Sequence, residues 1–578
     1  MTWNARKTRF MNRLHARIAS FSRPATAFST TPEPRTIGSF ARGRQITGGN
    51  FLFAGFLVEA PDTAIWDLPM PDEGFETEIH GFTWLDDLAA VGDHHATKRA
   101  QEWTHAWIAK NGRGAGPGWT PDLTGRRLIR WINHAILLLN GQEREVSEAY
   151  FRSLAAQTIF LSRRWKAASP GLPRFEALTG LIYAGLALDG MDAHVGHATR
   201  ALAQECAREI DADGGLSTRN PEELLEVFTL LNWAAAALQD MGQSPGAAHI
   251  AAIEAVARVL RALRHADGGL ARFHGGGRGL EGRLDRSLAS SGVKAISNEG
   301  LAMGYARISH GRTSVIADAA RPPRVEASAN GHASTLAFEL TSGRRPVIVN
   351  CGSGATFGKS WRRAGRATPS HSTLGIEGLS SSRLGVAGKL TERASEYLVD
   401  TPRDVRFERD EVDGGTRLVV GHDGYLSSHG LTHVRTLHLS VDGRSLSGED
   451  TLIAFDASDR KRFDLMFDKS KLRGIPFSVR FHLHPDVDAT LDMNGTAVSM
   501  ALKSGEIWVF RAGGEASLSL EQSVYLEKSR LSPRATKQIV LSGAAMEYAT
   551  RVNWSLAKAQ ETPSAIRDYA MDDVMAVD

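Results

Sequence analysis

The sequence predicts a multidomain protein of α and β structure, with helices packed together in the N-terminal half and antiparallel strands in the C-terminal half. From about residue 51 to residue 302, apolar residues recur at three- and four-residue spacing, the period of a helix that buries one face. From about Gly304 onward, apolar and polar residues alternate, which is the period of a half-buried strand. The 578 residues are enough for two separate hydrophobic cores.

The helical period is clearest in three segments, residues 128–141, 179–190 and 224–242. Each segment ends in glycine, which frequently stops a helix. Alanine and leucine cover much of the circumference of each predicted helix, as expected where a helix packs against neighbours on more than one side. We therefore expect a multi-helix bundle or toroid over residues 46–302, preceded by a peripheral segment, residues 1–45.

The alternating period recurs in short segments such as TSVIAD, STLAFEL, RPVIVN and THVRTLHLSVDG, with Gly, Asp and Asn between them. No long helical run separates these segments, which favours an antiparallel sandwich over a parallel α/β sheet. We assign residues 303–557 to this domain. Residues 558–578 are predicted to be a short acidic tail.

Composition favours an anionic partner other than nucleic acid. The net charge is only +3, but arginines cluster locally, and such patches attract anions. The clusters are Arg126, Arg127 and Arg130, and Arg362, Arg363 and Arg366. The chain has no lysine-rich run, zinc-finger spacing or aromatic RNA-binding motif, so we predict an acidic polysaccharide and no nucleic acid.

Cysteine usage and the N-terminus bear on the compartment. Two cysteines, Cys206 and Cys351, provide no disulfide framework. The N-terminus is basic and partly amphipathic but lacks the continuous apolar core of a secretory signal, and no segment reaches the roughly 20 apolar residues of a membrane span. We expect a cytoplasmic protein without an integral membrane segment; the alternative is the periplasm or cell envelope. The oligomeric state is unknown at this stage.

Three segments of the sequence, residues 213–233, 330–352 and 361–383, resemble the heparinase II/III-like family, and residues 421–440 resemble its later strand pair. The segment NGHASTLAFEL and the segment WRRAGRATPSHSTL are the most specific. The resemblance implies an α/α toroid followed by an antiparallel β-sandwich. It also implies a polysaccharide lyase that cleaves a uronic-acid linkage by β-elimination.

Such a β-elimination requires three functions. A hydrogen-bond donor or cation must neutralise the uronate carboxylate, a base must remove the proton at C5, and an acid must protonate the leaving oxygen at C4. Asn, Gln or Arg suits the first function, and His or Tyr suits the other two.

Asn220 occupies the place where similar lyases keep their carboxylate-binding residue. Arg219 beside it is expected to bind the substrate carboxylate in bidentate fashion, or else to form a surface salt bridge. Because Asn220 precedes Pro221 and two glutamates, it also fits a helix N-cap, and two alternatives stay open: capping alone, or capping together with substrate contact.

The resemblance also exposes departures from the family. Similar lyases carry a tyrosine in a later loop that closes the toroid, whereas here residues 267–279 contain His274 and no tyrosine. We expect His274 to act as base or acid; the alternative is an exposed loop histidine without a role. His134 on an early helix is a second catalytic candidate, or else a hydrogen-bonded core histidine, and Tyr183 is a substitute phenol for substrate binding. The family's second catalytic histidine is replaced by Asn330.

The resemblance places a structural zinc ion in the β domain. His332 and His371 match two of the family's ligands, while Asn350 stands at the usual aspartate. Asn350 is a poor zinc ligand, so we expect its neighbour Cys351, which lies 19 residues after His332 and 20 before His371, to bind instead. The alternative is a buried free cysteine with two hydrogen-bonded histidines. No organic cofactor is expected.

The leading functional prediction is therefore a lyase acting on a uronate-containing bacterial or host polysaccharide. The alternative is a non-catalytic glycan-binding or exopolysaccharide-assembly accessory on the same scaffold. Hydrolysis by paired carboxylates is a third possibility, but Glu222, Glu223 and Glu226 have the spacing of ordinary first-turn helix residues.

Overall fold

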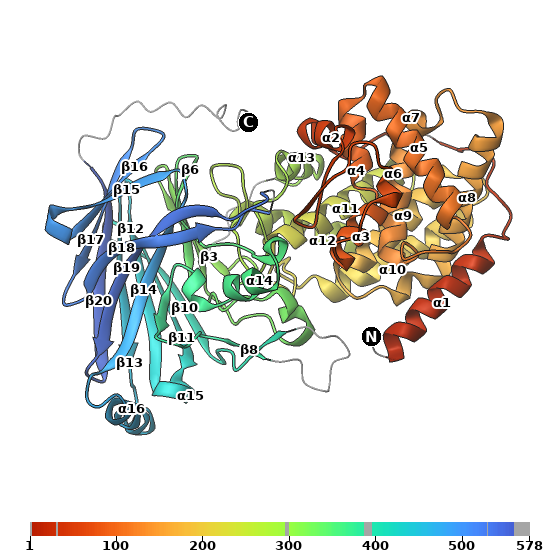
Figure 1. The fold of residues 1–578 in the computed structure, drawn as a ribbon. Coiled ribbons are helices and arrows are strands. Elements are labelled where there is room, and N and C mark those ends of the chain that lie inside the picture. Colours follow the sequence, from red (N-terminus) through yellow and green to blue (C-terminus); the bar gives the residue numbers. More distant parts are fainter. Residues whose placement is uncertain (1–2, 31–32, 295–299, 386–395, 529, 560–578) are drawn as a thin grey trace.

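A computed structural model of the chain describes residues 3–30, 33–294, 300–385, 396–528 and 530–559 (Figure 1). Helices fill one half of the molecule and β-sheets the other, so the predicted fold class is confirmed. The predicted acidic tail lies outside the described residues from residue 560 onward. No helix among the described residues is long and apolar enough to cross a membrane.

The N-terminal half consists mainly of helices. The helices are α1 (Trp3–Ala19), α2 (Phe40–Thr47), α3 (Glu73–His80), α4 (Trp84–Val91), α5 (His94–Asn111), α6 (Pro121–Asn133), α7 (Ala135–Leu139), α8 (Arg144–Arg164), α9 (Leu172–Ala187), α10 (Val195–Glu209), α11 (Pro221–Asp240), α12 (Ala247–Ala262) and α13 (Arg283–Ser290). A short hairpin, β1 (Asn50–Phe53) with β2 (Phe56–Glu59), lies among them. The segment predicted over residues 128–141 is interrupted at His134, where α6 ends and α7 begins.

One hydrophobic core joins these helices. Tryptophans from different helices meet edge to face within it, as Trp107 of α5 and Trp131 of α6 do at a centroid distance of 5.6 Å. Helix α1, within the segment predicted to be peripheral, packs on α8: Ala16 is fully buried, and Arg164 donates to the Asn12 Oδ1 at 2.9 Å.

The C-terminal half is built on two large antiparallel sheets. Their strand orders are β10-β11-β12-β13-β20-β17-β16-β15 and β18-β19-β14-β6-β5-β4-β3, with β7 paired to β14. The strands are β3 (Tyr305–His310), β4 (Thr313–Asp318), β5 (Phe338–Ser342), β6 (Arg345–Val349), β7 (Leu374–Ile376), β10 (Val405–Val412), β11 (Gly415–Tyr425), β12 (Leu431–Ser440), β13 (Ser445–Ile453), β14 (Ile475–Leu483), β15 (Val487–Asp492), β16 (Ala497–Leu502), β17 (Ile507–Gly513), β18 (Ser517–Tyr525), β19 (Arg534–Ala545) and β20 (Ala549–Lys558). A separate hairpin joins β8 (Arg383–Gly385) to β9 (Tyr397–Val399), and the helices of this half are α14 (Lys359–Gly365), α15 (Leu426–His429) and α16 (Ala457–Lys469).

The inner faces of the two sheets meet in a second core. Phe338 of β5 stacks on Trp554 of β20 at 5.9 Å, and Phe481 of β14 contacts Phe510 of β17 at 4.9 Å, so aromatic rings cross from one sheet to the other. Apolar side chains of the strands point into this core and polar side chains point outward, which is the alternation that the sequence predicts for a sandwich.

The helical core continues into the β half. Tyr305 of β3, Ile316 of β4 and Ala337 belong to the same buried cluster as the helices. Strand β3 is the edge strand of its sheet and lies at the centre of the molecule, against the helical half (Figure 1). The candidate functional residues lie along this seam.

Candidate functional site

Asn220 is the N-cap of α11. Its Oδ1 accepts hydrogen bonds from the backbone N–H groups of Glu222 and Glu223 at 3.0 and 3.3 Å. The glycine-rich loop packs directly on it: a Cβ added to Gly276 would lie 2.5 Å from the same Oδ1. Capping is therefore present, whereas the substrate contact of Asn220, which is 8% exposed, stays a prediction.

Arg219 joins the two halves of the molecule. All five of its N–H donors are used: Nε donates to the carbonyl of Met303, Nη1 to those of Ala320 and Arg321, and Nη2 to that of Gly304 and to the Asp318 carboxylate, over 2.6 to 3.1 Å. Because no donor remains for a substrate, the geometry does not support the expected bidentate contact with a uronate. The alternative role, a surface salt bridge, is not observed either, because Arg219 and its partner Asp318 are both buried.

Tyr305 completes this junction. Its hydroxyl donates to the Arg219 carbonyl at 2.5 Å, and the guanidinium of Arg219 lies 4.7 Å from the centre of its ring. Arg219 itself has a φ of +50°, a conformation that non-glycine residues adopt only where their surroundings hold them. The loop before α11 is thus held against β3 by backbone, side-chain and ring contacts.

His274 is buried in the same network and is not exposed on its loop. Its Nδ1 accepts from the backbone N–H of His332 at 3.0 Å, so its Nε2 carries the hydrogen; this Nε2 lies 3.6 Å from the Asp318 carboxylate and has no hydrogen-bond partner among the described residues. Burial lowers the pKa of His274 well below its usual value, and the nearby Arg219 adds to this effect. His274 is therefore a neutral imidazole held between the two halves.

His332 and His371 form a hydrogen-bonded pair. Their Nδ1 and Nε2 atoms are 3.0 Å apart, and the Nδ1 of His371 lies 2.9 Å from the Ala367 carbonyl. Because a carbonyl only accepts, the Nδ1 of His371 carries its hydrogen, and its Nε2 then accepts from the Nδ1–H of His332. Burial lowers the pKa of His371 to about 4 and lowers that of His332 as well, so both rings are neutral.

Cys351 does not join this pair. Its Sγ lies 3.5 Å from the Nδ1 of His482 and 3.9 Å from the Ser523 hydroxyl, and burial raises its pKa to about 11. The Oδ1 of Asn350 is held by the backbone N–H of Ser372 at 3.0 Å.

No group of three His, Cys, Asp or Glu side chains is placed to hold a metal ion in the part of the chain that the structure describes. The expected trio of His332, Cys351 and His371 is thus not assembled, and the arrangement does not fit a zinc site. The pattern of one histidine pair and a separate free cysteine matches the alternative that the sequence leaves open.

His134 and Tyr183 lie far from Asn220. The Nε2 of His134 lies 2.9 Å from Asp86 Oδ1 and 3.2 Å from the Thr36 hydroxyl, next to Arg35, which pairs with Asp240 at the end of α11. Since α11 has 20 residues, about 30 Å of helix separate this end from Asn220. The structure therefore does not bring His134 into one site with Asn220, and His134 is a hydrogen-bonded histidine of the helical core.

Tyr183 lies at the same distant end of α11. Burial raises the pKa of Tyr183; the nearby charge of Arg35 lowers this pKa and that of Asp240 raises it. Its hydroxyl is buried and has no hydrogen-bond partner among the described residues. Because Tyr183 is fully buried at this distant end, the structure does not bring it into one site with Asn220.

The sequence analysis did not identify two acidic residues, Asp318 and Glu339, that accept hydrogen bonds along the seam. Asp318 receives Arg219 and the Ser334 hydroxyl, and Glu339 receives the Arg272 backbone N–H at 3.0 Å. Each carboxylate sits in an otherwise uncharged segment, TSVIAD and STLAFEL, and both are buried. A charge inside a buried strand is the signal that would have identified them, because such a charge needs a partner.

Part of the chain matches a known protein family, and the whole chain resembles solved structures. Residues 293–555 match the family described as heparinase II/III-like, C-terminal. The predicted resemblance to the heparinase II/III-like family is thus confirmed over residues 293–555. Among solved structures, heparinase III covers 96% of this chain and 90% of its own at a TM-score of 0.68 and 12% identity. Heparan sulfate lyase HepC from Pedobacter heparinus covers 98% of this chain and 91% of its own, at a TM-score of 0.56 and 13% identity.

At these identities the two structures establish the shared fold. A curated protein is more similar in sequence. FtsZ-localized protein C of Caulobacter vibrioides (strain NA1000 / CB15N) is 29% identical over 552 residues, which cover 94% of this chain and 92% of that protein.

Proposed function

We propose that this heparinase-like chain binds an acidic polysaccharide without cleaving it and works as an accessory protein where FtsZ assembles. Polysaccharide binding is proposed from the family resemblance and the local arginine clusters, and the observation that supports the absence of cleavage is the burial of Arg219 and His274 in the seam. Arg219 has no free donor, and His274 is a buried neutral ring between Asp318 and the His332 backbone.

β-Elimination needs groups that the substrate can reach. A general base works best when its pKa lies near the operating pH and it lies within hydrogen-bond reach of the proton it removes. In this chain the pKa of His274 is lowered well below its usual value by burial, the family tyrosine is missing, and Asn330 replaces the second histidine. These features support binding over catalysis.

A lyase remains the second candidate, and Asn220 is the observation that favours it. It stands at the N-terminus of a 20-residue helix, where backbone N–H groups and the helix dipole favour an anion such as a uronate. Its place also matches the carboxylate-binding residue that the family resemblance implies.

A substrate panel separates the two candidates. We would incubate the protein with alginate, glucuronan, heparan sulfate and bacterial exopolysaccharides, and follow the ultraviolet absorbance of the unsaturated uronate product. The proposal expects no product with any of them, together with measurable retention on at least one polysaccharide matrix. Product formation that Asn220→Asp abolishes would establish the lyase instead, because aspartate preserves the helix cap but removes the amide donor.

The FtsZ part of the proposal rests on the name of the Caulobacter protein and on the length of the match. This part of the proposal includes a cytoplasmic location for the protein. The protein should co-sediment with FtsZ polymers from the same organism, and a fluorescent fusion should gather where FtsZ does. A uniform fluorescence and absence from the pellet would reject this part while leaving the polysaccharide proposal intact.

We infer separately that His332 and His371 do not hold the zinc ion that the family resemblance implies. Elemental analysis of protein purified without chelator tests it. The hydrogen bond between the two rings leads us to expect less than stoichiometric zinc, and a melting temperature that chelator leaves unchanged.

A further inference from the structure

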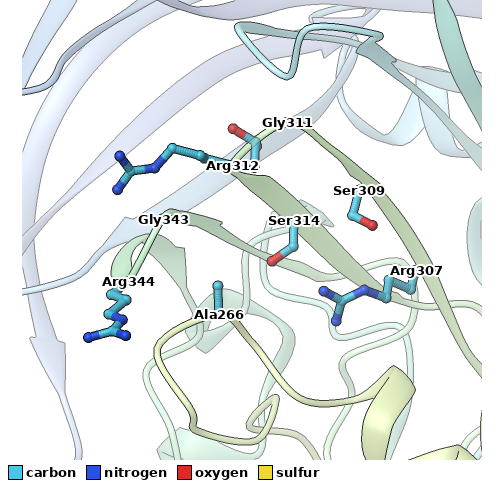
Figure 2. A pocket seen from close by; sticks show the side chains of 9 residues that line it. Ala266, Arg307, Ser309, Gly311, Arg312, Ser314, Gly343 and Arg344 are labelled. Atoms are coloured by element: carbon cyan, nitrogen blue, oxygen red, sulfur yellow. The ribbon is translucent and has the colours of Figure 1, made fainter. Parts of the chain in front are cut away.

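Two hollows meet at Arg307 of β3, where the edge of the sheet lies against the helical half. The smaller one measures about 410 Å³ and is lined by the C-terminal end of α12, the loop that follows it, α13 and Arg307. The larger one measures about 550 Å³ and extends along the β3–β4 turn. Figure 2 shows the Arg307 side chain extending from β3 toward Ala266, and both residues line both hollows. The smaller volume falls within the range of about 300–1,000 Å³ that small-ligand sites occupy.

Arg307 is held through only one of its three nitrogens. Its Nη1 donates to the carbonyls of Ala262 and Arg264 at 3.1 and 2.7 Å, at the C-terminal end of α12. In the part of the chain that the structure describes, its Nε and Nη2 have no hydrogen-bond partner. These two nitrogens form one edge of the guanidinium, and their parallel N–H bonds match the two oxygens of a carboxylate. The bonds to α12 therefore fix the side chain and leave this edge unused.

The charge of Arg307 has no counter-ion among the described residues. The neighbouring Arg264 pairs with Asp285 of α13 at 2.9 Å, so its own charge is already neutralised. Burial lowers the pKa of Arg307, and the like charge of Arg264 lowers it further, with no carboxylate acting in the opposite direction. The carbonyls at the end of α12 carry only partial negative charge. A half-buried cation of this kind is stabilised by an anion from outside.

The other groups that line the smaller hollow suit a sugar ring. Leu288 is half-buried and, with Ala266, gives the hollow apolar surface. The Asp285 carboxylate is available to accept a sugar hydroxyl besides its bond to Arg264. Arg261 donates to the carbonyls of Val293 and Lys294, so the wall on that side is fixed. Apolar surface with a few placed polar groups is typical of a small-ligand site.

We propose that the smaller hollow binds one uronate unit of an acidic polysaccharide, whose carboxylate accepts two parallel hydrogen bonds from the Nε and Nη2 of Arg307. This inference rests on the proposed polysaccharide binding and gives that binding a site. The sequence predicts a bidentate uronate contact for Arg219, but Arg219 spends all its donors inside the seam. Arg307 is the arginine of the seam that keeps the required pair of donors.

Calorimetric titration of the full chain with glucuronan and alginate oligosaccharides tests the site. Arg307→Lys keeps the positive charge and a donor for the α12 carbonyls but loses the paired N–H groups, so the affinity should fall about tenfold. Arg286→Lys makes the same change at an exposed position of α13 that does not line the hollow, and its affinity should equal that of the unmodified chain.

A second pair of variants leaves Arg307 and its contacts intact, so the test does not depend on the folding of Arg307→Lys. Ala266 is exposed and lies opposite Arg307 (Figure 2). Ala266→Glu places a carboxylate beside the free edge of the guanidinium and should weaken binding about tenfold by occupying it. Ala266→Gln adds a side chain of the same size without the charge and should retain the affinity of the unmodified chain.

Esterified ligands identify the group that is bound. Oligosaccharides whose carboxylates are all methyl-esterified should bind the unmodified and Arg307→Lys chains with equal, weakened affinity. A sulfated oligosaccharide whose uronates have been reduced to alcohols should likewise bind both chains equally. If Arg307→Lys weakens the binding of that sulfated ligand as much as it weakens oligouronate binding, the site takes sulfate and the uronate assignment is overturned.

The outcomes separate this inference from the proposed function. If the unmodified chain binds the oligouronates, and Arg307→Lys and Ala266→Glu bind them as tightly, only the assignment to this hollow is overturned. If the unmodified chain binds none of them, the polysaccharide proposal is overturned together with it. Weakened binding in both variants, with the affinity retained in Arg286→Lys and Ala266→Gln, is the result that the inference expects.

Discussion

Arg219 is the residue whose replacement we expect to destabilise the protein most. Arg219→Met removes five donors at once and leaves the Asp318 carboxylate buried without its cation. Breaking one side of a buried ion pair costs about 3–5 kcal/mol, so the free energy of unfolding in urea should fall by about 4 kcal/mol. The exposed pair of Arg144 with Glu148 supplies the control, because Arg144→Met should cost less than about 0.5 kcal/mol. Similar losses in both variants would contradict the clamping role.

The buried histidines of the seam make stability depend on pH. Burial lowers the pKa of His371 from 6.5 to about 4, so below pH 6.5 the unfolded chain binds a proton there that the folded chain does not. Stability should therefore fall as pH decreases from 6.5 toward 4, with about 3 kcal/mol from His371 alone. In urea titrations across this range, His371→Asn should show a shallower pH dependence by up to one proton, whereas the exposed His94→Asn should match the unmodified chain. Identical slopes for all three proteins would reject this account.

Among the individual elements, α11 depends on its cap. Asn220→Ala leaves the N–H groups of Glu222 and Glu223 without their acceptor and should cost about 1 kcal/mol, whereas Asn220→Asp keeps an acceptor and should cost only a few tenths. Thermal unfolding followed by circular dichroism measures both. A loss as large for the aspartate variant would show that the amide group has a structural partner besides the cap.

Helices and strands were predictable because their periods are local, whereas the seam is built from contacts between distant residues. Arg219 and Asp318 are 99 positions apart, and the sequence around either residue does not predict the other as its partner. Arg219 and His274 also have positive φ values of +50° and +45°, which their residue types do not suggest. The family resemblance placed His332 near His371, but it did not show that their rings bond to each other and leave Cys351 to His482.

At the scale of the whole molecule, we predict that the shared core and the Arg219 junction make the two halves unfold together. Gly304 tests this coupling. Its φ is +81°, and a Cβ there would lie 2.7 Å from the Nε and Nη2 of Arg219 and 2.7 Å from the Cβ of Ala320, so Gly304→Ala must displace these groups at the Arg219 junction. Gly190 is the matched control: its φ is +74°, but nothing lies within 4 Å of the added Cβ.

Gly190→Ala should therefore cost only the strain of a left-handed backbone, about 1–2 kcal/mol, and keep a single calorimetric transition. Gly304→Ala carries the same strain and also loses the junction, so its transition should broaden or split as the helical core and the β-sandwich unfold separately. If both variants show one transition with equal losses in melting temperature, the halves are coupled through the apolar contacts of Tyr305, Ile316 and Ala337 rather than through Arg219. The comparison therefore distinguishes coupling of the two halves through Arg219 from coupling through the apolar core.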